Sequence, residues 1–197
     1  MFIYLFIKME KRRENIENGM KIIHEGEKLF EMWKQIEGYP DYQVSSFGRV
    51  KRFYKNGNNK ILKPGTNENG YCNIKLCKNG KPTNVSVHRL VANAFLKNAK
   101  GKKCVDHIDN NRKNNHIHNL RFATHQENQQ NSKQSKRNTS GYKGVYWHQS
   151  SNKWLAYVTV NRKKFSIGYY NDIQEAVQAR QTKAKEIFGE FVNACEV

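Results

Sequence analysis

The chain reads CVDHIDNNRKNNHIHNLRFATHQEN from residue 104 to residue 128. Residues 104–107 and 120–123 are predicted to be short strands, and the asparagine- and histidine-rich segment between them is predicted to be a loop. Thr124 and Glu127 have the T-x-x-E spacing of a capping box, so a helix is expected to begin after Thr124. Strand, loop, strand and helix in so short a span predict a ββα unit.

Polar side chains of this unit suit phosphodiester cleavage, which requires an activated water and neutralisation of charge at the phosphate. Asp106 and His107 are neighbours at the end of a strand and point to opposite sides unless the strand bends there. Asn128 falls in the first turn of the predicted helix and could face Asp106. A carboxylate and a carboxamide suit Mg²⁺, and a histidine can accept a proton at neutral pH. Such an Asp-His pair alone is also compatible with a structural role.

The segment before this unit predicts a small β-rich module over residues 33–82. Its short β-prone runs are interrupted by Gly and Pro residues and by Asn-Gly pairs, of which Asn79-Gly80 is typical of a hairpin turn. A helix is predicted over 87–96, where the apolar residues recur at helical spacing. They are Val87, Leu90, Val91, Ala94 and Phe95.

A polar linker over 132–140 precedes a last module with three predicted strands, at 144–148, 154–160 and 164–169. Alternating residues in the second of these strands predict one buried face. A helix is predicted over 172–188, with Asp172 and Glu175 as a second capping box and Gly189 as its end.

The charge of the chain points to a polyanionic partner. The chain has 35 Lys and Arg residues against 17 Asp and Glu residues, a net charge of +18. Acidic and basic residues balance up to Trp33, and no acidic residue occurs between Asn128 and Asn171. A localised positive field with interleaved aromatic residues favours nucleic acid over a merely soluble basic protein.

Cysteine usage and the first residues bear on location. The four cysteines form no CxxC pair, and Cys72 and Cys77 lack a second half-site for zinc, which favours free thiols in a reducing compartment. The apolar run at 2–7 is too short to span a bilayer and has no cleavage signature after it. Residues 1–32 are expected to be a helical or disordered lead, and the protein is expected to be cytoplasmic, not secreted and not membrane-bound.

Several motifs together resemble the HNH homing endonucleases of phages and introns. They are VHRLVA at 87–92, VDHIDNN at 105–111, the Asn114-Asn115 pair and NLR at 119–121. WKQIEGY at 33–39 and VSSFGRV at 44–50 resemble the NUMOD-type motif that often precedes this nuclease domain.

This resemblance implies roles for individual residues. Asp106 and Asn128 correspond to the ligands of one divalent cation, Mg²⁺ or another such as Mn²⁺, and His107 corresponds to the general base. Asn119 corresponds to the middle residue of the signature and is expected to brace the loop that holds His107. The third signature position is Asn128 and not histidine, which argues against zinc-loaded versions of the site. His116, His118 and His125 lie in the same region and are expected to be solvated.

The last module resembles the APETALA-two/ethylene-response-factor (ERF) DNA-binding domain, through SGYKGVYW at 140–147 and FGEFVN at 188–193. In that family a three-stranded sheet lies in the major groove, which implies base contacts here from outward-facing strand residues. Plant members have arginines where this chain has Tyr146, His148 and Thr159, so their recognition sequence is not expected to carry over. The full set of predicted DNA-binding residues is Arg49, Lys51, Arg121, Lys143, Tyr146, His148, Tyr157, Thr159, Arg162, Lys163 and Lys164.

These observations predict a modular α+β protein. Its expected parts are the lead (1–32), a NUMOD-type β-rich module (33–82), an HNH ββα-metal nuclease domain (83–134) and an ERF-like DNA-binding domain of three strands and a helix (141–193). The predicted function is that of a site-targeted endonuclease that acts as a monomer on double-stranded DNA, with a nick as the expected product. The alternative is a non-enzymatic DNA-binding regulator with a decayed nuclease unit.

Overall fold

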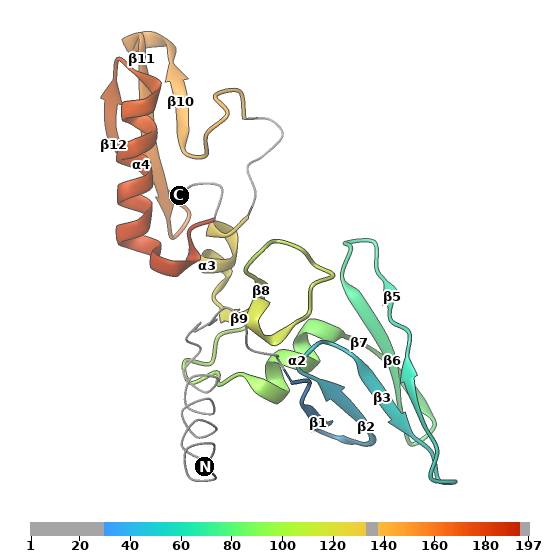
Figure 1. Cartoon of the computed structure of the whole chain (residues 1–197). Helices are drawn as coiled ribbons and strands as arrows, with labels where there is room; N and C mark the ends of the chain where they lie inside the picture. Colours follow the sequence, from blue (N-terminus) through green and yellow to red (C-terminus); the bar gives the residue numbers. More distant parts are fainter. Residues whose placement is uncertain (1–29, 133–137, 194–197) are drawn as a thin grey trace. The chain divides into compact units, whose positions relative to one another are not determined.

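The computed structural model describes residues 30–132 and 138–193, and it is a mixed α+β fold with several small sheets and few helices, as predicted (Figure 1). The chain divides into two compact units at Phe122/Ala123, and each unit is described by itself. Residues 1–29 of the predicted lead, and Cys195, lie outside the described residues.

The first unit begins with two antiparallel sheets. Four strands follow one another in the first sheet: β1 (Trp33–Ile36), β2 (Tyr39–Ser45), β3 (Val50–Phe53) and β4 (Asn59–Leu62). The second sheet contains β5 (Gly65–Thr66), β6 (Cys72–Lys78) and β7 (Lys81–Ser86). Asn79 and Gly80 join β6 to β7 with φ angles of 52° and 75°, which confirms the predicted hairpin turn.

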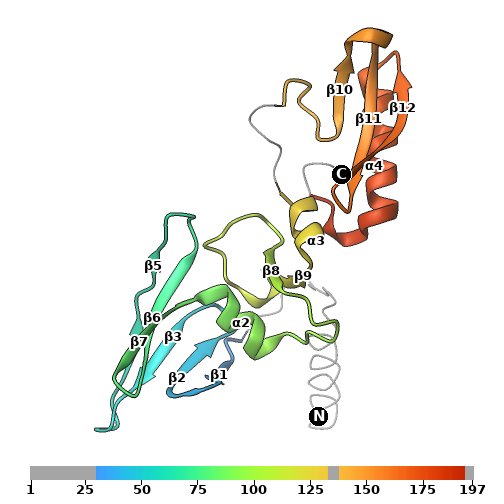
Figure 2. The same cartoon turned by 180° about the vertical axis from the view of Figure 1, so that it is seen from behind.

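Helix α2 (Val87–Phe95) packs against strands of both sheets and ends one residue before the predicted limit (Figure 2). Its apolar residues join one continuous core with residues of the two sheets and of the following loop. That core includes Tyr42, Val44, Leu76, Val91 and Leu120. The segments predicted as a β-rich module and as the start of a nuclease domain therefore share one hydrophobic core.

Strands β8 (Cys104–His107) and β9 (Leu120–Ala123) form a two-stranded sheet at the predicted positions, separated by a loop and the short 3₁₀ helix η1 (Ile117–Asn119). The loop between them is attached to the first sheet, because Ile117 N donates to Ser46 O over 2.8 Å. This attachment joins residues far apart in the sequence.

The second unit contains the predicted three-stranded sheet, with strands in the order β10 (Val145–His148), β11 (Lys153–Val160) and β12 (Lys163–Tyr170). The 3₁₀ helix η2 (Gln149–Ser151) joins β10 to β11. Helix α4 (Ile173–Phe188) covers one face of the sheet, as both views show, and η3 (Gly189–Phe191) follows it (Figures 1 and 2). The side chain of Asp172 accepts hydrogen bonds from the backbone of Gln174 and Glu175, so it caps this helix at the predicted residue.

One local prediction for β11 is wrong, namely the strict alternation of buried and exposed residues. A register shift between Ala156 and Tyr157 places an extra residue of β12 opposite this point. Leu155 and Ala156 are neighbours in β11 and are both buried. The extra residue of the bulge, Ile167, lies in β12, so the bulge changes the side on which later residues of β12 fall.

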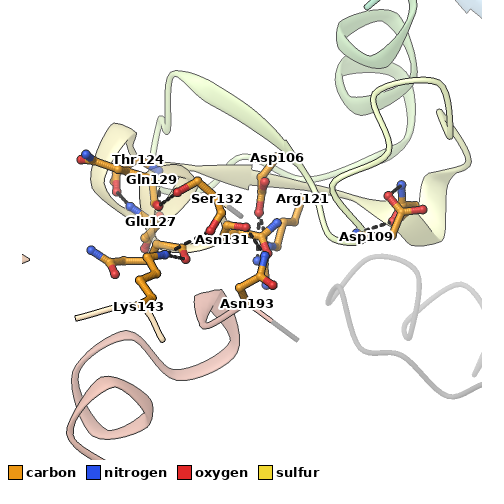
Figure 3. Close-up of polar contacts among 12 residues, drawn as sticks. Asp106, Asp109, Arg121, Thr124, Glu127, Gln129, Asn131, Ser132, Lys143 and Asn193 are labelled. Atoms are coloured by element: carbon orange, nitrogen blue, oxygen red, sulfur yellow. Dashed lines mark hydrogen bonds and ion pairs between the residues drawn. The ribbon is translucent and has the colours of Figure 1, made fainter. Parts of the chain in front are cut away.

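Helix α3 (His125–Gln130) belongs to the second unit and begins at the predicted capping box (Figure 3). The Thr124 side chain accepts from Glu127 N over 3.2 Å, and Thr124 N donates to the Glu127 carboxylate over 2.7 Å. Six residues are too few for a helix that is stable alone. Hydrogen bonds hold it, from Gln130 Nε2 to Thr159 O (3.3 Å), from Asn161 N to Gln126 Oε1 (3.0 Å) and from Lys143 Nζ to Gln130 O (2.6 Å).

Within residues 30–132 and 138–193, no helix combines the length and the apolar character needed to cross a bilayer.

Candidate active site

Asp106 and His107 are buried neighbours at the end of β8, with 4 % and 5 % of their surfaces exposed. They contact different partners. Nε of Arg121 on β9 donates to Asp106 Oδ2 over 2.9 Å, and Nη2 forms an ion pair with the same oxygen, also over 2.9 Å (Figure 3). A buried carboxylate requires such compensation, since desolvation penalises its charge. Arg121, predicted to contact DNA, thus has an intramolecular partner in this site.

The ring of His107 is enclosed by two aromatic rings and an amide. The ring centroids of His88 and Tyr71 lie 5.1 and 5.9 Å from that of His107. His107 Nε2 lies 3.1 Å from Oδ1 of Asn115. Burial is the main cause that lowers the pKa of His107, and it outweighs the opposing influence of Asn115 and of the nearby carboxylates. The imidazole is therefore neutral at neutral pH, as a general base must be.

Asn119 holds the loop that follows His107. Its Nδ2 donates to Asp109 Oδ1 and to Asn114 O, each over 2.8 Å, and its Oδ1 accepts from Asp109 N over 3.0 Å. Burial would raise the pKa of Asp109, but hydrogen bonds from Asn114, Asn111 and Asn119 outweigh it and lower that pKa. These contacts have the geometry that the bracing role requires, and the role itself stays a prediction.

His88 on α2 is a second buried histidine beside the site, with 8 % of its surface exposed. Its Nδ1 is buried without a hydrogen-bond partner. Burial, followed by the nearby His107 and Arg89, lowers the pKa of His88 to about 4. A buried nitrogen without a hydrogen-bond partner costs about 1–3 kcal/mol of stability, so His88 destabilises the fold at this position.

Asn128, the second predicted metal ligand, lies on α3 in the second unit, where its N–H donates to Thr124 O over 3.0 Å. Among the described residues, no group of three or more His, Cys, Asp or Glu side chains is arranged to hold a metal. The predicted donors are instead one carboxylate and one amide oxygen. Hard oxygen donors in small number fit Mg²⁺ or Mn²⁺, which retain waters and accept phosphate oxygens.

The predicted DNA-binding side chains of the second unit gather on the sheet. Tyr146, His148, Tyr157, Lys164 and Tyr169 form a chain of ring and cation contacts, which we call the aromatic face. Its ring centroids are 5.7 Å apart for Tyr146 and Tyr157 and 5.2 Å apart for His148 and Tyr169. Lys164 Nζ lies 4.8 Å from the centre of the Tyr157 ring. This face is distinct from the core side, where Val145 and Ala156 pack against α4.

The remaining residues that were predicted to bind DNA lie in both units. Thr159 lies on β11, and Lys163 and Lys164 on β12 flank the hairpin turn formed by Asn161 and Arg162. Lys143 donates to carbonyl groups at the end of α3, a structural contact that the sequence did not reveal. In the first unit, Arg49 forms an ion pair with Glu31, and Lys51 Nζ lies 4.0 Å from the Trp33 ring.

Sequence reasoning missed three residues of these sites: Asn115, His88 and Tyr169. Asn115 stood inside a quoted motif, but nothing in its spacing shows that its amide reaches His107. His88 also stood inside a quoted motif, VHRLVA, but nothing in that motif shows that its ring lies beside His107. Tyr169 joins the aromatic face because of the register of β12, which the bulge sets.

Comparison with known proteins supports the prediction of an HNH nuclease domain. Residues 31–77 match the NUMOD4 motif, and residues 85–130 match the HNH endonuclease family. Over 100 residues the chain is 42 % identical to the DNA endonuclease I-HmuI of Bacillus phage SP01, covering 50 % of this chain and 56 % of that protein. Over 87 residues it is 37 % identical to Protein 3.8 of Escherichia phage T7, covering 44 % of this chain and 71 % of that protein.

Two further similarities complete the comparison. An uncharacterised HNH endonuclease, L245 of Acanthamoeba polyphaga mimivirus, is 38 % identical over 93 residues, which cover 47 % of this chain and 27 % of that protein. A solved structure of the HNH homing endonuclease I-HmuI, described for its DNA binding and cleavage, aligns with a TM-score of 0.48 and 29 % identity over 81 % of this chain and 91 % of that chain.

The chain belongs to the HNH endonuclease family. The matches confirm the predicted resemblance to HNH enzymes and to the NUMOD-type motif. The chain spans only about a quarter to just over half of the first relatives' lengths, 27 % and 56 %. Both family matches end by residue 130, so the sheet of β10–β12 and α4 lie outside them.

Proposed function

We propose that the protein is a metal-dependent, site-targeted DNA endonuclease in which His107 is the general base. The observation that carries this proposal is a buried histidine, whose pKa is lowered by burial, next to a buried carboxylate, inside the segment that matches HNH endonucleases. The relative I-HmuI is itself named as a DNA endonuclease.

In this mechanism His107 accepts a proton from the attacking water, while Asn119 keeps the loop after β8 in place. Asp106 and Asn128 would hold one divalent cation, Mg²⁺ or Mn²⁺. When bound, the cation supplies positive charge that stabilises the scissile phosphate and the leaving oxygen. One nuclease unit per chain makes one cut per binding event, so we propose a nick in double-stranded DNA by a monomer, in the cytoplasm of a bacterial or phage-infected cell.

We also propose that the ERF-like sheet of the second unit reads DNA with its aromatic face. Support comes from exposed Tyr146 and Tyr169, with 38 % and 47 % of their surfaces accessible, beside Lys164. A small nuclease unit buries too little surface for a long recognition site, so a separate reading surface is expected. Arg162 and Lys163 at its hairpin would contact phosphates.

Cleavage of supercoiled plasmid tests the proposal, with Mg²⁺ present and then removed by EDTA. His107→Ala should lower the single-turnover rate by about a hundred- to ten-thousand-fold, because it removes the base, while DNA affinity stays nearly unchanged. Binding without any cleavage by the unaltered protein would instead favour the alternative, a DNA-binding regulator with a decayed nuclease unit.

A further inference from the structure

A glycine of the first sheet lies against the amide that contacts the general base. Gly48 has φ of +82°, and a Cβ on it would stand 2.7 Å from Asn115 Cβ and 3.1 Å from Asn115 O. Both distances are below ordinary van der Waals contact. Any other residue at Gly48 therefore has to displace Asn115.

The turn over residues 45–49 has its own internal support. Ser45 Oγ accepts from Arg49 N over 2.9 Å, and Gly48 N donates to Ser45 O over 3.0 Å. Ser45 and Ser46 are almost completely buried. The turn is thus held by buried hydrogen bonds of its own beside Asn115.

Two further contacts attach the segment between β8 and β9, which follows His107, to this turn. Ile117 N donates to Ser46 O over 2.8 Å, and the rings of Phe47 and His116 lie in contact with centroids 4.6 Å apart and an angle of 36° between their planes. Together with the Gly48–Asn115 approach, they hold both the backbone and the side chain of the loop.

Asn115 in turn defines which nitrogen of His107 carries the proton. Its Nδ2 donates to Lys113 O over 3.2 Å, so its Oδ1 is the atom directed at His107 Nε2, 3.1 Å away. An amide oxygen only accepts, and Nε2 must therefore be the protonated nitrogen of the neutral ring. This leaves Nδ1 with the lone pair that accepts a proton.

We propose that Asn115 is a positioning residue for His107, and that the 45–49 turn of the NUMOD4 segment holds Asn115 in place through Gly48. The turn is then part of the nuclease site in addition to any contact it makes with DNA. This inference rests on the proposed function, because it assigns Nδ1 of His107 as the atom that takes the proton.

The test uses the full chain and compares Gly48→Ala with Gly57→Ala. Gly57 has the same φ of +82° but nothing within 4 Å of its added Cβ, so it reproduces the backbone strain without the collision. Gly48→Ala should lower the single-turnover cleavage rate about tenfold or more, with DNA affinity within about twofold, while Gly57→Ala should change neither. Equal rates for the two variants would overturn the proposal.

Asn115 variants keep the test valid if Gly48→Ala folds poorly. Asn115→Ala removes the acceptor and should lower the rate by about 10- to 100-fold, whereas Asn115→Asp keeps an acceptor and should retain most activity. Adding Gly48→Ala to Asn115→Ala should cost little more, since residues that act through one another are not additive. Full additivity, or equal loss in the Asp and Ala variants, contradicts the role.

A readout independent of cleavage separates this inference from the proposed function. Nitrogen-15 NMR of the His107 ring at pH 8 should show protonated Nε2 in the unaltered protein and in Gly57→Ala. A mixture of both tautomers is expected in Gly48→Ala and Asn115→Ala. Tautomers that respond in this way in a protein that never cuts plasmid would overturn the nuclease and keep the positioning role. Unresponsive tautomers in an active enzyme would overturn the positioning role alone.

Discussion

Arg121, on the neighbouring strand of the β8–β9 sheet, contacts a single oxygen of Asp106, Oδ2, through a hydrogen bond from Nε and an ion pair with Nη2. The side chains are 13 % and 5 % exposed, so the pair is shielded from solvent. The carboxylate predicted to hold a cation therefore already has a positive partner. Arg121 holds the Asp106 side chain in place at the end of β8.

Replacing this arginine should make stability depend on divalent cations. Arg121→Gln removes a positively charged partner of a buried carboxylate, which should cost about 3 kcal/mol. Added Mg²⁺ or Mn²⁺ should restore part of the loss by binding only the folded chain. Thermal unfolding with and without the cation measures both effects. Arg89→Gln, which loses one bond to the carbonyl of Lys103, is the control and should cost about 1 kcal/mol with no cation response.

Metal dependence should distinguish the two predicted ligands. Asp106→Asn and Asn128→Ala should each raise the Mg²⁺ concentration for half-maximal cleavage, and Asp106→Asn should do so more because it removes a charge. Asp41→Asn, an exposed carboxylate on β2, serves as the control. A variant that cuts like the unaltered protein at low Mg²⁺ does not carry a ligand.

His88 should make the fold sensitive to acid. Burial lowers the pKa of His88 in the folded protein to about 4, below its ordinary value of 6.5. The unfolded chain then binds the proton first. The free energy of unfolding therefore carries no penalty from His88 above pH 6.5. It falls as the pH drops from 6.5 towards 4, by about 3 kcal/mol in all.

Chemical denaturation at several pH values measures this dependence. His88→Phe keeps a ring at the position and removes the titration, so its free energy of unfolding should fall less steeply between pH 6.5 and 4. His125→Gln changes an exposed histidine and should follow the unaltered protein. If all three curves are parallel, the acid sensitivity arises elsewhere.

In the β11–β12 hairpin, one substitution should maintain or raise stability and weaken DNA binding. Asn161 and Arg162 occupy the turn with φ of 49° and 64°, a conformation in which glycine would be favoured at the second position. Arg162→Gly should leave the free energy of unfolding unchanged or raise it by up to about 1 kcal/mol. It should also lower the slope of log affinity against log salt by about one unit, as loss of one phosphate contact requires.

A variant of equal charge tests whether this effect is local. Lys185→Gln removes one positive charge from α4, which covers the other side of the sheet. Its salt slope should match that of the unaltered protein. Equal slopes for Arg162→Gly and Lys185→Gln would show that the hairpin is not a DNA contact.

Local patterns predicted most elements of the fold. The T-x-x-E spacing places the start of α3, and Asn79-Gly80 places the β6–β7 hairpin, because capping and tight turns depend on residues close together in the chain. Asp106, His107 and Asn119 were found because they stand in a motif with characteristic spacing. Each of these depends on interactions over a few residues.

Contacts between distant residues escaped prediction. The register shift between β11 and β12 depends on how the two strands pair, and the contacts of Gln130 with Thr159 and of Asn131 with Asn193 depend on packing within the second unit. Neither leaves a local signature. Deleting residues 141–197 would therefore also remove partners of α3, so point variants are the better test of the second unit.

The sequence alone determines the types of the elements, the strongly positive charge and the candidate chemistry of Asp106 and His107. Folding in three dimensions adds the partner of each: Arg121 for the carboxylate, and Asn115, held by Gly48, for the imidazole. The physical reason is range. Backbone preferences and capping act over a few residues, whereas the protonation and orientation of a buried group depend on whichever side chains the fold brings within a few ångströms.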